Sequence, residues 1–326
     1  MVQSPFFWIP AGGFEIPMID VSGKVETERI AEAEAFVCLN EETLQRVKDG
    51  TVEKGNVFEV ARVAGITAAK NTAHLLPFCH PIALDWITVY IEVEKGGLRI
   101  RSSVKAVAKT GVEMEALVAV CSSALTVYDM LKPYQKDIRI EGIHLLKKTG
   151  GIKEFLPPFA SSLKAGVLVC SDRVASGVRE DRSGKFIVQF LNSYSIPVEA
   201  YHIVPDEKEI IRQTVRQWVE QGIPLVVTTG GTGVGPRDVT VEAVRDLIER
   251  EMPGVAEAMR SYGQKRTPYA MISRSVAGFS GKTLIITLPG SFRGVKESLQ
   301  AIFPGILHAF EVFYASEQAH EKREGL

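Results

Sequence analysis

Residues 225–240 read LVVTTGGTGVGPRDVT, in which an apolar strand runs into a glycine-rich loop and then into a helix from Thr240. A loop of this kind places backbone N–H groups beside a helix N-terminus, which is a common way to bind phosphate. The stretch is not a dinucleotide fingerprint, because Pro236 stands where that motif needs glycine, and no Gly-Lys-Ser/Thr completes a P-loop. On this stretch alone, a tight turn without a ligand explains the glycines equally well.

The sequence around this loop alternates strands with helices. Strands are predicted at residues 167–170, 198–204, 225–229 and 284–288, and helices at 184–194 and 207–221, from 240 and after 291. This alternation predicts an α/β domain with a mostly parallel, Rossmann-like sheet and helices on both faces. Strand ends of such a sheet share one edge, where ligands bind. Polar motifs stand at these ends or open the next helix: Ser171-Asp172-Arg173, Asp181–Gly184, Pro205–Glu207 and Pro289-Gly290-Ser291.

The first half of the chain has a different pattern. Strands are predicted at 36–39 and 138–146, with a hairpin formed by 84–94 and 98–107. Helices are predicted at 41–48, 56–76 and 112–131, and Gly50, Pro77 and Pro133 follow them. Antiparallel strands with helices on one face indicate an α+β domain of ferredoxin-like type.

Glycine, proline and serine gather between the two halves, at Gly150-Gly151, Pro157-Pro158 and Ser161-Ser162. This is the composition of a linker. We therefore divide the chain into an N-terminal extension (1–17), a first domain (18–151), a linker (152–163) and a second domain (164–326). No internal repeat relates the two halves.

Composition excludes several classes of protein. The 38 Lys and Arg nearly balance the 39 Asp and Glu, giving a net charge of −1, so a general nucleic-acid or membrane-surface binder is not expected. The four cysteines form no C-x-x-C pair, which argues against a structural zinc site or a disulfide scaffold. The N-terminus is a poor signal peptide, and the longest apolar stretch, 116–127, is too short for a membrane span. We expect a cytoplasmic protein.

Several ionisable residues of the first half stand out, although each has an ordinary interpretation. His80, by itself, is best explained as a loop histidine, because no further metal ligand lies at a suitable spacing. Glu113 fits a role at a helix N-terminus, whereas Glu115 precedes an apolar run and needs a partner or a function if it is buried. Asp129 and Lys132 have the spacing of an exposed helical ion pair.

Together, these residues resemble the cyclic pyranopterin monophosphate synthase family (MoaC) of molybdenum cofactor biosynthesis, from about Met18 to Gly151. The ordered motifs include Ile19-Asp20-Val21-Ser22, Lys54-Gly55, Ala61–Ile66, Cys79-His80-Pro81, Lys109–Ala116 and Tyr128-Asp129-Met130. The family implies a lyase that converts 3',8-cyclo-7,8-dihydro-GTP into cyclic pyranopterin monophosphate and pyrophosphate, without a tightly bound cofactor. It implies catalytic Asp129, Lys54 and Lys132, with Phe78, Cys79, His80, Met114, Glu115, Arg29 and Lys148 around the substrate.

The implied chemistry suits these residue types. Lysine and arginine can hold a triphosphate and ease the departure of pyrophosphate. Ring opening and closure of the cyclic phosphate need proton transfers, for which a carboxylate beside lysines is suitable. One departure from the family is Gly151-Ile152-Lys153, which replaces the usual glycine-lysine-serine end of the last loop.

The strand-end motifs of the second half resemble the molybdopterin adenylyltransferase family (MogA/MoaB), over about Lys164 to Phe313. The family implies transfer of AMP from ATP to the terminal phosphate of molybdopterin, with catalytic Asp206 and Asp238. A magnesium ion would accompany ATP beside these two carboxylates, and no structural metal is expected. Pterin or nucleotide contacts would come from Ser171, Asp172, Gly230, Gly231, Thr232, Gly233, Arg237, Pro289, Gly290 and Ser291. One departure is Phe292, which stands where the family usually has proline.

We therefore expect a bifunctional molybdenum cofactor enzyme that acts on small molecules: the cyclised dihydro-GTP, molybdopterin and ATP. Sulfur insertion separates the two steps, so the fusion does not imply channelling. The main alternative is that the second domain is a pterin-binding carrier or assembly module without catalysis. A nonspecific nucleotide-binding protein accounts for fewer of the motifs.

The spacing of two implied site residues predicts how the protein assembles. Glu115 and Asp129 are 14 positions apart (129 − 115) on one predicted helix, which corresponds to about 21 Å along its axis. One compact pocket cannot easily use both from one copy, so we expect active sites between the subunits of a homo-oligomer. The resemblances imply hexameric and trimeric arrangements, so a trimer or hexamer is expected.

Overall fold

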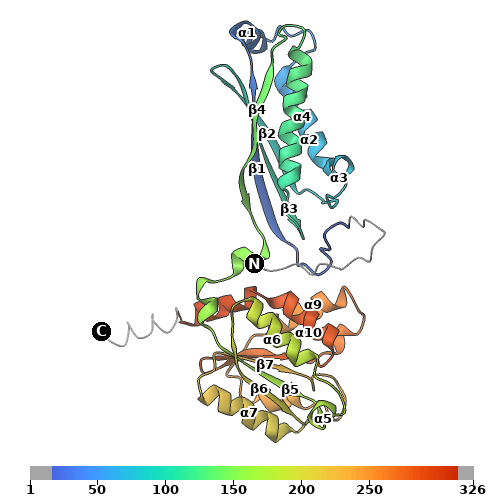
Figure 1. Ribbon diagram of the computed structural model, residues 1–326, viewed down its shortest axis with the longest axis vertical. Helices are drawn as coiled ribbons and strands as arrows, with labels where there is room; N and C mark the ends of the chain where they lie inside the picture. The colour runs from blue at the N-terminus through green and yellow to red at the C-terminus, as the bar shows by residue number, and fades with distance from the viewer. Residues whose placement is uncertain (1–16, 315–326) are drawn as a thin grey trace, which may run out of the picture. The chain divides into compact units, whose positions relative to one another are not determined.

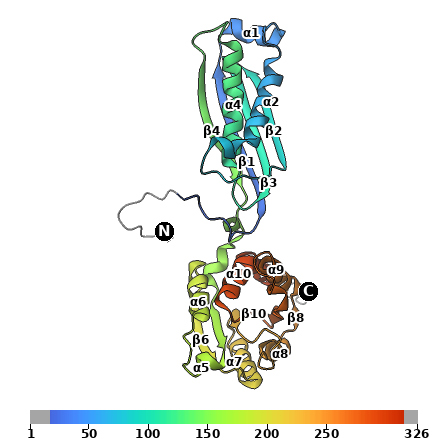
Figure 2. The same cartoon turned by 90° about the vertical axis from the view of Figure 1, so that its right-hand side faces the viewer.

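The computed structural model describes residues 17–314 of the 326-residue chain. The chain divides into two compact units, residues 1–151 (unit 1) and 152–326 (unit 2), which are drawn in Figures 1 and 2. Nearly all of the proposed N-terminal extension, residues 1–16, lies outside the described residues.

Unit 1 is built on a four-stranded antiparallel sheet with the strand order β2-β3-β1-β4. Every second residue of its central strand β1, from Ala31 to Val37, is fully buried. This is the alternation of a strand with one face on a core, and the α+β prediction is confirmed. The strands are β1 (Thr27–Cys38), β2 (Trp86–Glu94), β3 (Gly97–Ala108) and β4 (Arg139–Thr149).

The prediction of a strand at 36–39 was wrong in extent, because β1 already begins at Thr27. The alternation is hard to read in the sequence, since alanines occupy the core face and glutamates the other. Glu34 on that outer face pairs with Arg99 (2.9 Å) and Arg101 (3.2 Å) of the neighbouring strand β3. Cross-strand ion pairs thus support a strand that has few β-branched residues.

Helices cover one face of this sheet, and α2 and α4 run side by side along it (Figure 1). Gly65 of α2 permits the close approach, because a Cβ there would collide with Ser123 Oγ of α4. The predicted helix at 56–76 is in fact broken at Asn71, whose side-chain amide donates to the Thr67 carbonyl (2.8 Å). The helices are α1 (Glu41–Asp49), α2 (Val57–Lys70), α3 (Thr72–Leu75) and α4 (Glu113–Leu131).

Helix α4 forms the centre of the unit 1 core. Its residues Ala116, Ala119, Ala124 and Val127 are completely buried. By length and composition α4 is also the one helix of the described residues that could cross a membrane, yet half of its most apolar window is buried inside the unit. Burial against a sheet accounts for this apolar sequence.

Unit 2 contains a six-stranded sheet with the order β6-β5-β7-β10-β9-β8. β5, β6, β7 and β10 are parallel, whereas β9 pairs antiparallel with β10 and β8 pairs antiparallel with β9 at one side. The mostly parallel sheet is therefore confirmed. Its strands β8 and β9 were not predicted, since both are very short. The strands are β5 (Ala165–Cys170), β6 (Val198–Val204), β7 (Leu225–Thr229), β8 (Arg250–Glu251), β9 (Ala277–Ser280) and β10 (Thr283–Leu288).

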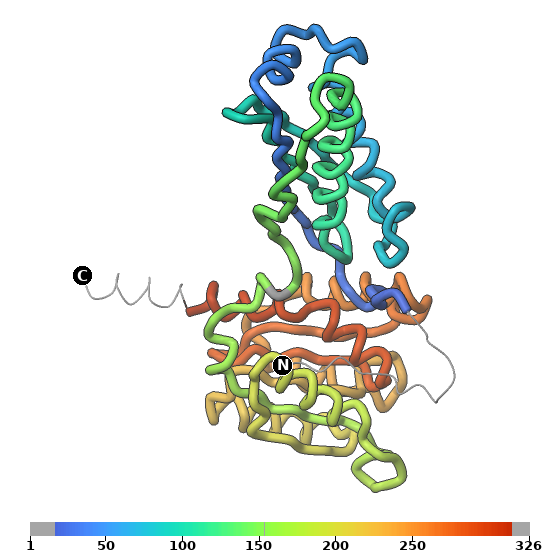
Figure 3. Tube along the Cα trace, turned by 45° about the horizontal axis from the view of Figure 1, so that its top comes forward, coloured from blue at the N-terminus to red at the C-terminus, as the bar shows by residue number. Residues whose placement is uncertain are grey.

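Helices cover both faces of this sheet, as predicted. Figure 2 shows α6, α9 and α10 on one side and α7 and α8 on the other, and the chain path can be followed in Figure 3. The helix from Thr240 has only 6 residues. The helices are α5 (Asp172–Ala175), α6 (Ser183–Ser193), α7 (Lys208–Glu220), α8 (Thr240–Arg245), α9 (Pro253–Gln264) and α10 (Phe292–Ile302).

The segment proposed as a linker has structure of its own. Two short 3-10 helices occupy it, η1 (Ile152–Phe155) and η2 (Pro158–Ser162). Ala160 and Leu163 are buried in the core of unit 2. The last part of this segment therefore packs as the first element of unit 2.

Candidate active sites

The carboxylate of Asp129, near the end of α4, lies between two ammonium groups. Lys132 Nζ is 2.7 Å from its Oδ1, and Lys54 Nζ is 2.7 Å from its Oδ2. Lys54 also donates to the Asp129 carbonyl (2.8 Å). Hydrogen bonds from Lys132 first, and from Lys54 next, lower the pKa of Asp129 to about 2. Asp129 thus stays ionised at neutral pH, and the three exposed side chains form a preset group of two cations and one anion.

A second group of expected site residues lies at the other end of α4. Glu115 is only 4% exposed, and its Oε2 has no hydrogen-bond partner within residues 17–314. Burial raises the pKa of this carboxyl above its ordinary value. The pKa of the Cys79 thiol is also raised, by burial and then by the nearby charge of Glu115. A raised pKa favours the protonated form of a carboxyl, which is the form that can donate a proton to a bound substrate.

Arg29 and Lys148 are held near this same end of the sheet. Arg29 Nη1 donates to the Gly150 carbonyl (3.2 Å), and Lys148 Nζ lies 3.5 Å from Glu113 at the start of α4. Gly151 has a φ of +129°, and a Cβ there would come within 2.7 Å of the Arg29 guanidinium. Glycine at 151 therefore lets the last loop close on Arg29, although the residues after it depart from the family.

The expected residues of unit 1 are thus divided between two places. The structure brings Lys54 and Lys132 to Asp129, and Cys79 to the neighbourhood of Glu115. It does not bring Asp129 to Glu115, because both lie on the 19-residue helix α4, about 21 Å apart along its axis. Phe78 and Met114 are exposed and His80 is half-buried.

The expected residues of unit 2 gather at one edge of the sheet. Asp172 and Asp206, which follow β5 and β6, each accept a hydrogen bond from the other's backbone N–H (3.0 Å). The Arg237 guanidinium donates to both carboxylate oxygens of Asp172 (2.9 Å) and to Glu207 (3.0 Å). Arg237 lowers the pKa of Asp172, whereas burial raises that of Asp206. Neighbouring strand ends are therefore fixed together through carboxylates.

Glycine is required where the loop crosses this edge. Gly230 has a φ of +101°, and a Cβ there would collide with the Cys170 carbonyl at the end of β5. Gly290 lies against it from the end of β10, where a Cβ would be 3.1 Å from Gly230 Cα. Three strand ends thus meet without side chains between them. Asp238 closes the loop, since its Oδ2 accepts a hydrogen bond from the Gly235 N–H (2.7 Å).

Arg274 is a residue of this site that the sequence did not reveal. Its Nε donates to the Gly233 carbonyl (2.6 Å), and its Nη2 donates to the Asp238 carbonyl (2.6 Å). The guanidinium also pairs with Glu242 of α8. Arg274 lies in an irregular segment before β9, far from the loop in sequence, so no motif spacing could have indicated it.

A pocket of about 420 Å³ opens beside the end of β10. Ser291 in its wall caps α10 by accepting a hydrogen bond from the Gly294 N–H (3.1 Å). Phe292 packs edge-on against Phe186 at 5.3 Å between ring centroids, with the Arg182 guanidinium 5.1 Å above its ring. Aromatic packing therefore holds the turn at Phe292. Pro289, Arg260, Thr267, Ser273, Ser275, Arg293 and Glu297 also line the pocket.

The side chains at this edge offer oxygen atoms, which are the ligands that a magnesium ion prefers. No three His, Cys, Asp or Glu side chains within residues 17–314 form a cluster that could hold a metal ion. Asp206 and Asp238 each use one carboxylate oxygen in a hydrogen bond within the protein, which leaves the other for a cation. Magnesium is commonly held by one or two carboxylates together with substrate phosphates.

Comparisons with known proteins find a separate family match in each half of the chain. Residues 18–151 match the MoaC family, and residues 166–308 match a probable molybdopterin binding domain. The molybdenum cofactor biosynthesis bifunctional protein of Chlorobaculum tepidum is 40% identical over 298 residues, which cover 90% of this chain and 94% of that protein. The protein of the same name from Synechococcus elongatus is 37% identical over 318 residues, covering 94% and 100%.

Among solved structures, the molybdopterin biosynthesis enzyme MoaB from Thermus thermophilus is 44% identical, with a TM-score of 0.44. The match covers 46% of this chain and 95% of that one. The fusion expected from the sequence motifs is confirmed by the two family matches and the full-length relatives. The chain belongs to the family of molybdenum cofactor biosynthesis bifunctional proteins, in which a MoaC-family domain is joined to a probable molybdopterin binding domain.

Proposed function

We propose that unit 1 converts the cyclised dihydro-GTP into cyclic pyranopterin monophosphate and pyrophosphate. The observation that carries this proposal is the group formed by Lys54, Asp129 and Lys132. In the phosphate step a substrate hydroxyl attacks the innermost phosphorus, and the bond to pyrophosphate breaks. The two ammonium groups meet the charge that develops on the leaving oxygens, and Asp129 holds them in place before the substrate arrives.

Proton transfer requires a group other than Asp129 to supply the proton. A carboxyl with a pKa near 2 is ionised at neutral pH and holds no proton to donate. Glu115 is suited to that role, because burial raises its pKa. We assign Glu115 the role of proton donor during ring opening because it is buried and its Oε2 has no partner within residues 17–314, with Arg29 and Lys148 nearby to hold the triphosphate.

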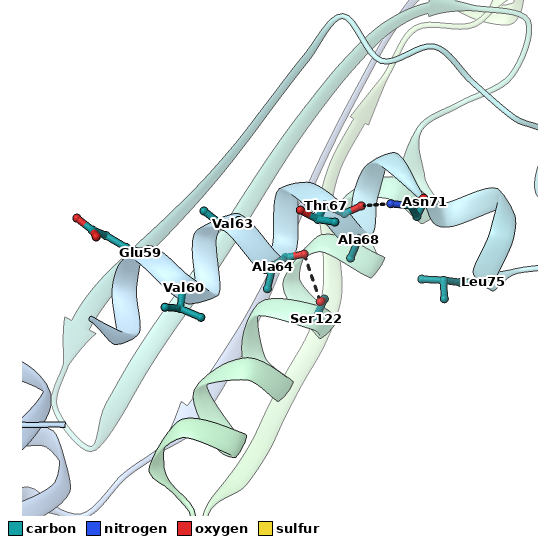
Figure 4. Close-up of a pocket in the computed structure, with 9 residues that line it drawn as sticks. All are labelled: Glu59, Val60, Val63, Ala64, Thr67, Ala68, Asn71, Leu75 and Ser122. Atoms are coloured by element: carbon teal, nitrogen blue, oxygen red, sulfur yellow. Dashed lines mark hydrogen bonds between the residues drawn. The ribbon is translucent and has the colours of Figure 1, made fainter. Parts of the chain in front are cut away.

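The distance along α4 means that a complete site needs two copies of the chain. Glu115 and Asp129 lie symmetrically about Ser122, so two antiparallel α4 helices crossing there would place Glu115 beside the partner's Asp129. Partly exposed side chains run along α4 at the spacing of a helix–helix seam: Met114, Val118, Cys121, Leu125 and Tyr128. Beside Ser122 lies an apolar groove of about 760 Å³ on α2, shown in Figure 4. These features support a homo-oligomer with a twofold contact, which of the two expected arrangements a hexamer contains and a trimer does not.

We propose that unit 2 transfers AMP from ATP to the terminal phosphate of molybdopterin. The observation that carries this proposal is the pair Asp206 and Asp238, each with one free carboxylate oxygen, beside the glycine loop. The magnesium ion of Mg-ATP would bind there and offset the charge of the phosphates. The pocket beside Ser291 lies next to the same edge and is large enough for the pterin.

Incubation of the full chain with molybdopterin and Mg-ATP tests the second activity. We expect adenylylated pterin and one pyrophosphate for each transfer, both detected by mass spectrometry and a coupled phosphate assay. If the protein binds molybdopterin tightly but never consumes ATP, unit 2 is a carrier. The same preparation supplied with the cyclised dihydro-GTP should release cyclic pyranopterin monophosphate, which tests unit 1 independently.

A further inference from the structure

In the middle of the glycine loop, the backbone carbonyl groups are hydrogen-bonded within the part of the protein that the structure describes and the backbone amides are not. The carbonyl oxygens of Gly231, Thr232 and Gly233 accept hydrogen bonds from Thr240 N (3.1 Å), Arg274 N (2.9 Å) and Arg274 Nε (2.6 Å). The amides of the same three loop residues donate to no acceptor in the described part of the chain. These three residues therefore present three unused donors, while their three carbonyl acceptors are satisfied.

Arg274 supplies two of these three contacts to the carbonyls. It also donates to the Asp238 carbonyl (2.6 Å) and pairs with Glu242, whose pKa it lowers. A single residue thus ties the middle of the loop to its end and to α8. Its guanidinium contacts the loop through carbonyl oxygens and its charge is offset by Glu242, so its effect on a ligand comes from fixing the loop.

We infer that Arg274 is a positioning residue that holds the glycine loop with its amides free for the phosphates of the nucleotide. This inference rests on the proposed binding of Mg-ATP at unit 2. Arg274 need not touch the ligand. The short helix α8 cannot supply the same effect through its dipole, because it has only 6 residues.

The test compares Arg274→Gln and Arg274→Lys in the full chain. The matched control is Arg245→Gln, since Arg245 is the last residue of α8 but pairs with Glu251 (3.6 Å), and within residues 17–314 its side chain has no hydrogen bond or ion pair to the loop. Hydrogen–deuterium exchange follows the bonded amides of Gly235, Asp238 and Thr240, and calorimetry measures the binding of Mg-ATP and of inorganic pyrophosphate without molybdopterin.

We expect Arg274→Gln to speed exchange of these amides and to weaken Mg-ATP binding by about 10- to 100-fold, because at least two charge-assisted hydrogen bonds are lost. Arg274→Lys should recover part of the affinity, since it keeps the charge without the planar fork. The control should match the unaltered protein in both measurements.

Two results would overturn the inference: faster exchange in Arg274→Gln with unchanged affinity for both probes, or no change in either measurement. Absence of binding of both Mg-ATP and pyrophosphate to the unaltered protein would overturn it together with adenylyl transfer. If the unaltered protein binds Mg-ATP but forms no adenylylated pterin, only the transfer proposal fails, and Arg274 is still judged by affinity.

Discussion

The two candidate sites of this chain are built on different kinds of scaffold. The expected site residues of unit 1 include Glu115 and Asp129. Both lie on a 19-residue helix that extends about 28 Å. Those of unit 2 follow several parallel strands, which all end at one edge. A helix distributes its residues along a line, whereas a parallel sheet gathers them. The site proposed for unit 1 would therefore need a second copy, whereas the site proposed for unit 2 can be complete in one.

The largest expected effect is the loss of the first activity on breaking the Lys54–Asp129–Lys132 group. Asp129→Ala and Lys54→Ala should each lower formation of cyclic pyranopterin monophosphate by about 1,000-fold or more, because charges at the leaving group are lost or released. Circular dichroism should show an intact fold, since all three side chains are exposed. Lys48→Ala, an exposed lysine of α1, is the control. Near-normal turnover in both variants would refute the assignment.

A smaller loss of activity is expected in unit 2 when one of the two carboxylates Asp206 and Asp238 is removed. Asp238→Ala should lower pyrophosphate release from Mg-ATP by about 100-fold, while molybdopterin affinity stays nearly unchanged. Asp246→Ala, an exposed carboxylate just after α8, should leave the rate alone. Equal losses of pterin affinity and of rate would mean that Asp238 supports the loop and has no specific part in the transfer.

Mixing inactive variants tests directly whether the sites of unit 1 are shared. Asp129→Ala and Glu115→Ala are each expected to be inactive, but mixed pairs contain one intact site. Each pair has two sites, and in a mixed pair one site has both residues while the other lacks both. Random exchange makes half of the pairs mixed, so about a quarter of full activity should return. Mixing Asp238→Ala with Asp206→Ala should restore nothing if each site of unit 2 lies within one copy. No recovery after demonstrated subunit exchange would place the first site within a single chain.

The smallest effect concerns stability, and it depends on pH. Because burial raises the folded-state pKa of Glu115, its contribution to stability is full at low pH and is lost as pH rises through that pKa. Glu115→Gln removes this loss, so it should raise the unfolding temperature at pH 8 more than at pH 5, while lowering activity. Glu41→Gln, an exposed control, should show no such difference. A greater stabilisation at pH 5 would contradict the burial argument.

Much of the fold could be predicted from the periodicity of apolar residues and from the glycines and prolines that end helices and strands. The strands of unit 2 are short apolar runs, and their parallel order follows from the alternation with helices. The length of β1 was not apparent, because alanines and glutamates alternate there without the usual strand residues. The very short β8 and β9 gave no signal at all.

The sites were predictable where residues stand in local motifs, and not where the contact is between distant segments. Asp129 and Lys132 are three positions apart, and the structure pairs them. Arg274 reaches Gly233 across 41 positions, from a segment without regular structure. The pairing of Arg237 with Asp172 and Glu207 likewise depends on how the strand ends meet, which only the folded sheet determines.

The carboxylates at the edge of the unit 2 sheet also have a collective consequence. The carboxylates of Asp172, Asp206, Glu207, Asp238 and Glu242 outnumber the guanidinium groups of Arg237 and Arg274 by five to two, so these side chains formally carry a net charge of −3. A nucleotide without its cation brings further negative charge into this field and is repelled, whereas the cation-bound form is not. The edge can thus select ligands by ionic state before their shape is recognised. When divalent cations are scarce, we expect unit 2 to lose its proposed activity, while the lysines of unit 1 still attract their anionic substrate.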